Sequence, residues 1–131
     1  MPSDVQKAAL VDQFISVENS YFSDPITKLI REMHAKFRGV TTNPEIVKEA
    51  REEINNNVLD IYEKFLEGKD YLTGEFSLAD VFHCPFMHYS IRAGHGDLWS
   101  DPKRPNVARW WKNLSERESL KKLVAEKKLF V

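Results

Sequence analysis

The sequence lacks the features of disulfide-linked and membrane-spanning proteins. Of its 131 residues only Cys84 is a cysteine, so no disulfide framework forms and a reducing compartment is expected. No apolar run approaches the roughly 20 residues that cross a bilayer. The N-terminal Met-Pro-Ser-Asp has neither the basic nor the apolar region of a signal peptide. We therefore expect a cytoplasmic protein that does not enter a membrane.

The sequence also lacks an excess of charge of one sign. Its net charge is −1, which argues against a general nucleic-acid footprint. The charge is uneven, because the segment from Asp101 onward carries nine Lys or Arg against four Asp or Glu. The simpler interpretation is that these cations solvate helix ends near the C-terminus. The alternative is contact with an anionic partner surface.

Glycine is scarce, with five residues, and no segment shows strand-like alternation of useful length. Apolar residues recur at helical spacing from Asp4 to Phe37, which predicts a long first helix. Pro25 lies inside this pattern, and a proline there removes a backbone donor and crowds the preceding turn. We expect a kink near residues 22–24 and a helix end at Gly39, which suits the left-handed cap.

Four more helices follow from local signals. Asn43 and Pro44 are typical of a helix cap and first turn, and Gly68 ends this second helix. Ser77 and Asp80 have the spacing of a capping box at the start of a third helix, which is apolar on most sides and ends near Gly94. Helices over about 105–117 and 119–127 complete the pattern. The sequence therefore predicts an all-α five-helix bundle, with a kinked first helix and a buried central third helix.

Several motifs resemble the C-terminal domain of glutathione transferases, and the phi class most closely. The resemblance covers about residues 8–123 and is strongest in the Tyr-Leu-x-Gly and Ser-Leu-Ala-Asp string. The matching segments are Val11–Glu18, Val58–Glu63, Tyr71–Asp80, His83–Phe86 and Val107–Trp111. Phe14 departs from the pattern, because phi relatives often have tryptophan there.

The resemblance implies one glutathione transferase C-terminal-like domain over residues 1–131, without the thioredoxin-like N-terminal domain. That missing domain supplies the glutathione site, a cis-proline and the thiol-activating Ser, Tyr or Cys in complete relatives. The resemblance thus implies a hydrophobic-ligand wall, and a homodimer formed partly through the first two helices. It does not imply glutathione chemistry for this chain alone.

The other reactive residues favour structural roles. Ser77 and Asp80 are interpreted as a helix cap and not as a catalytic pair. His83 and His88 are five residues apart and diverge by about 140° around a helix, so they are poorly spaced to chelate a metal. Cys84 is expected to be a buried structural thiol. We expect no metal and no cofactor, and we read His95-Gly96-Asp97 as a plain connection.

The first helix carries the candidate ligand site. Ile30, Met33, His34 and Phe37 share a stripe at helical spacing, on the half-helix that faces the hydrophobic-substrate pocket in the resembled family. The stripe is either plain core with His34 at the surface, or one wall of a small apolar pocket. In the second case His34 is a candidate acid or base, because histidine titrates near neutral pH.

Three functional hypotheses follow. The first is a stand-alone helical domain, dimeric, that binds a small apolar ligand or a protein partner and does not conjugate glutathione by itself. The second is one part of an active glutathione transferase whose glutathione-binding domain lies on another segment or chain. The third is a cofactor-free isomerase or cyclase of small-molecule metabolism that reuses the apolar pocket.

Overall fold

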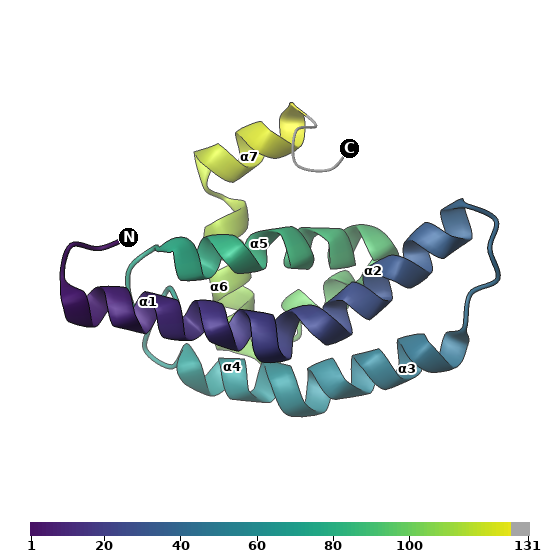
Figure 1. Cartoon of the computed structure of the whole chain (residues 1–131), viewed down its shortest axis with the longest axis horizontal. Helices are drawn as coiled ribbons and strands as arrows, with labels where there is room; N and C mark the ends of the chain where they lie inside the picture. Colours follow the sequence, from purple (N-terminus) through teal and green to yellow (C-terminus); the bar gives the residue numbers. More distant parts are fainter. Residues whose placement is uncertain (127–131) are drawn as a thin grey trace.

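The computed structural model describes residues 1–126, which fold into five continuous helical segments without a strand (Figure 1). This confirms the all-α five-helix prediction. Residue 127, the predicted end of the last helix, lies outside the described residues. Two π-helical turns join α1 to α2 and α3 to α4, and a third, followed by a 3₁₀ turn, extends α5. The α-helices are α1 Val5–Val17, α2 Ser23–Phe37, α3 Pro44–Glu53, α4 Leu59–Phe65, α5 Leu78–Ser90, α6 Pro105–Ser115 and α7 Glu118–Ala125.

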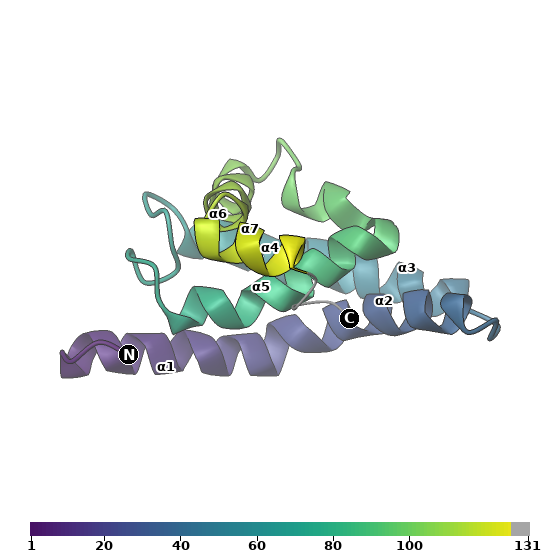
Figure 2. The same cartoon turned by 90° about the horizontal axis from the view of Figure 1, so that it is seen from above.

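The first helical segment bends just before the position at which the sequence predicts a kink. α1 and α2 run as one long helix along one side of the molecule, joined by the π-helical turn Glu18–Phe22 (Figure 2). The wider turn lies just before Pro25, which has no backbone N–H to continue the α-helical pattern and whose ring crowds the preceding turn. The distortion thus falls slightly earlier than residues 22–24, and it leaves Pro25 buried.

Helix ends follow the local chemistry of the sequence. The Asn43 side chain accepts a hydrogen bond from the Glu45 amide at 3.0 Å, and Pro44 opens α3. Gly39 adopts the left-handed conformation, with φ of 69°, directly after α2. The loop over residues 38–43 therefore reverses the chain, and α3–α4 returns beside α1–α2 as an antiparallel hairpin (Figure 1).

Helix α5 is central, as predicted, and contacts both α1 and α2. Ala79, His83 and Met87 lie on its buried face. Its opposite face departs from the prediction of a helix buried on most sides, because Val81 and Phe82 are 41% and 47% exposed. No helix among residues 1–126 combines the length and the apolar character that a membrane crossing requires.

An aromatic cluster fills the core around α5. Phe22, Tyr62, His83, Trp99 and Trp110 come from five different elements, and neighbouring ring centroids lie 4.5–5.9 Å apart. Trp99 lies beyond the predicted end of the third helix near Gly94. It is nevertheless fully buried, and its indole N–H donates to Ser90 Oγ at 2.7 Å. Burying a tryptophan ring removes a large apolar area from water, which favours this loop folding inward once the N–H finds a partner.

Asp80 joins three parts of this core. Its Oδ2 accepts the Ser77 amide at 3.0 Å, which completes the predicted capping box. Its Oδ1 accepts the Leu72 amide at 3.1 Å and the Trp110 indole N–H at 2.8 Å. Burial raises the pKa of the Asp80 carboxyl, and these hydrogen bonds oppose that shift. Asp80 therefore ties the loop before α5 and helix α6 to the start of α5.

Replacing Asp80 by alanine should destabilise the fold strongly. The variant leaves the buried N–H donors of Leu72 and Trp110 without an acceptor, at about 1–3 kcal/mol each, and also the half-buried Ser77 amide. We therefore expect a loss of at least about 2 kcal/mol of unfolding free energy. Urea unfolding followed by circular dichroism measures it. Asp12→Ala, at an exposed position of α1, is the matched control. A loss below about 0.5 kcal/mol, the size of a surface change, would contradict the structural role of Asp80.

Candidate ligand-binding cleft

A cleft of about 530 Å³ opens between the second half of α2, the start of α3 and the turn after α5. Its volume falls within the 300–1,000 Å³ typical of small-molecule sites. Apolar and polar side chains line it in equal number. The apolar lining residues are Leu29, Met33, Phe37, Val47 and Ala93, and the polar ones are Glu32, Lys36, Thr42, Arg92 and His95.

The structure brings together only part of the predicted stripe. Met33 and Phe37 line the cleft, whereas Ile30 and His34 do not. Ile30 packs half-buried against the core, and His34 is exposed. The reason is helical geometry, because residues 29, 33 and 37 form one row at i, i+4 spacing, while residues 30 and 34 form the next row about 100° further round. The predicted stripe therefore combined residues from two adjacent rows of the helix surface.

A charged cluster that the sequence analysis missed supports the floor of the cleft. Arg51 of α3 contacts His95 Nδ1 through Nη1 at 2.7 Å and forms a two-point ion pair with Asp97. Burial lowers the pKa of His95, with help from the Arg51 charge and against that of Asp97. The Arg51 hydrogen bond lowers the pKa of Asp97. No local signal marks this cluster, since Arg51 is 44 residues from His95 and 46 residues from Asp97.

The contact with Arg51 determines which ring nitrogen of His95 carries the proton. A guanidinium only donates hydrogen bonds, so His95 Nδ1 must be the acceptor and carries no proton. Neutral His95 therefore holds its proton on Nε2, where the ring can donate one hydrogen bond. The segment read as a plain connection thus places a neutral donor, His95, in the lining of the cleft.

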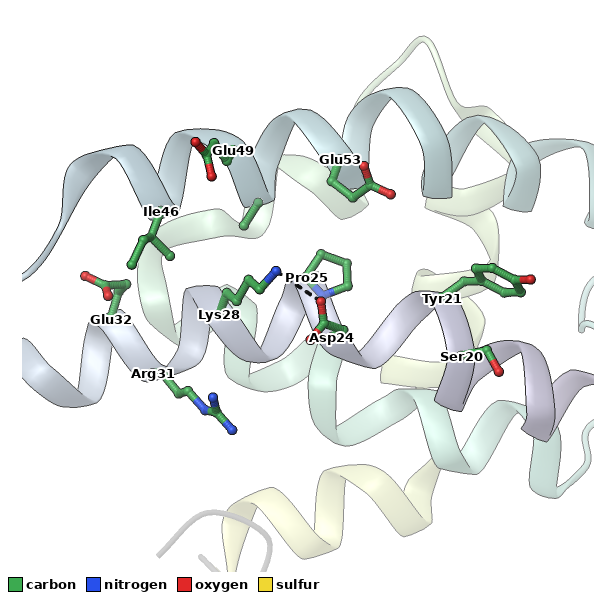
Figure 3. Close-up of a pocket in the computed structure, with 11 residues that line it drawn as sticks. Ser20, Tyr21, Asp24, Pro25, Lys28, Arg31, Glu32, Ile46, Glu49 and Glu53 are labelled. Carbon is green, nitrogen blue, oxygen red and sulfur yellow. Dashed lines mark ion pairs between the residues drawn. The ribbon is translucent and has the colours of Figure 1, made fainter.

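A second hollow lies along the same pair of helices, between α2 and the body of α3. Figure 3 shows its labelled side chains, with Tyr21 and Ile46 at either end and the Lys28–Asp24 ion pair, 3.1 Å long, beside Pro25. Its volume is about 580 Å³, and carboxylates of Glu32, Glu49 and Glu53 make it more acidic than the first cleft. The Tyr21 ring is exposed on this face.

The buried reactive residues of α5 have structural roles, as the sequence indicated. His83 Nε2 lies 2.8 Å from the Tyr62 hydroxyl, its Nδ1 lies 2.5 Å from the Ala79 carbonyl, and burial lowers its pKa to about 4. Burial raises the pKa of the Cys84 thiol to about 12, which makes it a poor nucleophile. Within residues 1–126, no group of three His, Cys, Asp or Glu side chains is placed to hold a metal ion.

Known proteins resemble this chain over nearly all of its length. Residues 19–118 match the family described as glutathione S-transferase, C-terminal domain. A probable glutathione S-transferase of Oryza sativa subsp. japonica, GSTF1, is 34% identical over 125 residues, which are 93% of this chain and 56% of the rice protein. Glutathione S-transferase F13 of Arabidopsis thaliana is 34% identical over 122 residues, 92% of this chain and 54% of that protein.

Solved structures of glutathione transferases also resemble this chain. Glutathione transferase F2 from Populus trichocarpa superposes with a TM-score of 0.88 at 32% identity, over 96% of this chain and 59% of the poplar chain. Glutathione S-transferase I from maize, in complex with an atrazine glutathione conjugate, gives a TM-score of 0.86 at 29% identity, over 98% of this chain and 60% of that chain. The chain thus spans between half and three fifths of the length of these relatives.

Proposed function

This chain belongs to the glutathione S-transferase C-terminal domain family, and on that premise we propose that it is a helical ligand-binding domain that binds a small apolar molecule and does not conjugate glutathione by itself. The observation that carries the proposal is the cleft beside α2. It joins an apolar row from one helix to a few polar groups held by other elements. That combination is typical of small-molecule sites, where apolar walls give affinity and fixed polar groups give orientation.

The side chains of the cleft support a ligand that is mainly apolar. Met33 adapts its shape to irregular ligands, because its thioether chain has three rotatable bonds. Phe37 is 81% exposed at the rim, so a bound molecule would remove its ring from water. His95, held by Arg51, is available to donate one hydrogen bond to a carbonyl or hydroxyl oxygen of the ligand.

The second hypothesis is that this domain works beside a glutathione-binding domain on another segment or chain. One observation favours it. Helix α5 exposes an apolar face with Leu78, Val81 and Phe82, which a second domain would cover. Under this hypothesis the cleft beside α2 remains a ligand site, and the thiol chemistry comes from the other domain.

We also place the protein in the cytoplasm, as the sequence analysis expected. Cys84 is a free, buried thiol, and it is the sole cysteine of the sequence. A fold that depends on packing and caps, without a disulfide, suits a reducing compartment.

The cleft proposal predicts that Met33 matters for binding and that His34 does not. We expect the neutral fluorescent probe N-phenyl-1-naphthylamine to bind about tenfold more weakly to Met33→Gln, because the probe loses an apolar contact surface. His34→Gln, one position along α2 and outside the cleft, is the matched control and should bind within about twofold of the unaltered protein. Equal losses of probe affinity in both variants would indicate that Met33 and His34 contribute alike, as the predicted stripe implies, and would refute the cleft as the binding site. Fluorescence titration at constant protein concentration measures both.

The 131-residue chain alone should not conjugate glutathione. The reaction requires the glutathione thiol to be held as a thiolate by a nearby donor, and the resemblance assigns that donor to the thioredoxin-like domain. We expect no turnover of glutathione with 1-chloro-2,4-dinitrobenzene above that of a boiled sample, by absorbance. Saturable turnover that follows the protein concentration would overturn the proposal. The assay and the probe titration are independent, so either can fail alone.

We further propose a homodimer that uses the end of α2. The sequence predicts a homodimer formed partly through the first two helices. Ile26 and Leu29 already lie in the core of one chain, so only the region of Met33 and Phe37 is available for this contact. A symmetric pair is the commonest way to cover such an apolar surface.

Sedimentation equilibrium tests the dimer. We expect twice the 15.3 kDa chain mass at micromolar concentration, and a shift to monomer in Phe37→Glu, which places a charge in the contact. Val5→Glu is the matched control, because Val5 and Phe37 are both 81% exposed and Val5 lies at the start of α1. A monomer in the unaltered protein, or equal dissociation in both variants, would exclude this interface.

A further inference from the structure

A smaller cavity, separate from the cleft beside α2, lies between α5 and the pair α6–α7. Its volume is about 230 Å³. Figure 1 shows α7 set off from the end of α6 on the same side of the molecule as α5. The lining is almost entirely apolar, from Phe76, Val81, Leu114, Leu120 and Leu123, and Arg117 brings the single charged group.

The Arg117 guanidinium has an incomplete set of partners. Its central carbon lies 3.5 Å from the centre of the Phe76 ring, and its Nη1 lies 3.5 Å from the Tyr71 hydroxyl oxygen. Its Nε is buried and makes no hydrogen bond. Among residues 1–126, no carboxylate lies within ion-pair distance of Arg117, whereas Arg51 and Arg104 each pair with aspartates. A half-buried cation in an apolar setting without a counter-charge favours an anion.

The start of α7 adds a second feature that favours an anion. Arg117 is the N-cap residue, with extended backbone at φ −66° and ψ 133°, and no side chain caps the helix. Ser119 and Leu120, in the first turn, line the same cavity. The first N–H groups of a helix have no partner within it and carry partial positive charge. The guanidinium and the uncapped helix end therefore meet at one edge of an apolar cavity.

We propose that this cavity binds a small apolar monocarboxylate. The carboxylate pairs with Arg117 and faces the first turn of α7, and the hydrocarbon part lies among Val81, Leu120 and Leu123. The volume is below the 300–1,000 Å³ of drug-sized sites, so the ligand is one aromatic ring or a short alkyl chain. Glu116 and Glu118 flank Arg117 in sequence, but both side chains are exposed, and Glu118 has Lys121 as a partner at 4.0 Å. The proposal is independent of the cleft beside α2, since the two cavities share no residue.

The test compares benzoate with benzamide, which has nearly the same shape and no charge. Isothermal titration calorimetry should show benzoate binding at least tenfold more tightly than benzamide. In Arg117→Gln this preference should disappear, with benzamide affinity within twofold of the unaltered protein. Arg38→Gln, an exposed arginine after α2, is the matched control and should keep the full preference.

Equal affinity for the two compounds in the unaltered protein, or the same preference in Arg117→Gln, would overturn the proposal. A measurement on the unaltered protein covers the case in which Arg117→Gln does not fold. Protons of bound benzoate should show nuclear Overhauser contacts to the methyl groups of Leu120 and Leu123. Contacts that appear only at Met33 or Val47 would assign benzoate to the other cleft and equally refute the site.

Discussion

The fold depends on one buried carboxylate. Asp80 accepts hydrogen bonds from Leu72, Ser77 and Trp110, and these donors span the loop before α5, its N-cap and helix α6. A carboxylate without water is stable only when such donors surround it, so its partners cannot move apart independently. Through Trp110 the constraint reaches the aromatic cluster, where Tyr62 and the bend at Phe22 pack. The bend of the first helix therefore packs against a core whose position is fixed.

Features set by neighbouring residues could be predicted from the sequence. Asn43 with Pro44, and Ser77 with Asp80, satisfy backbone donors within three residues, so their spacing alone indicates a helix start. The contacts of Trp99 and Arg51 could not be predicted in this way. They join residues that only the packing of the folded chain brings together, Trp99 with Ser90 and Arg51 with His95.

Of the four residues of the predicted stripe, only Met33 and Phe37 line the cleft beside α2, for the same reason. Helical periodicity identifies which residues share a side of α2, but two adjacent rows were close enough to be taken as one. Only the position of α3 decides between them, because the returning helix faces the row of Leu29, Met33 and Phe37. His34, one row round, stays at the surface. Tertiary packing thus decides which of the candidate residues line the cleft.

The two cavities differ in their electrostatics, and this difference assigns them different ligands. At the cleft beside α2 the charges are mixed, because Glu32 lies among Lys36 and Arg92, and its carboxylate already accepts the Asn43 amide at 2.7 Å. His95 is held neutral there by Arg51. An ionised ligand would bind weakly in such a site. It would lose its hydration, and the positive and negative side chains around it would largely cancel each other's attraction. At the smaller cavity no carboxylate of residues 1–126 lies within ion-pair distance of Arg117, and the apolar walls weaken screening by water. The cleft beside α2 therefore favours a neutral apolar molecule, and the smaller cavity at the start of α7 favours an anionic one.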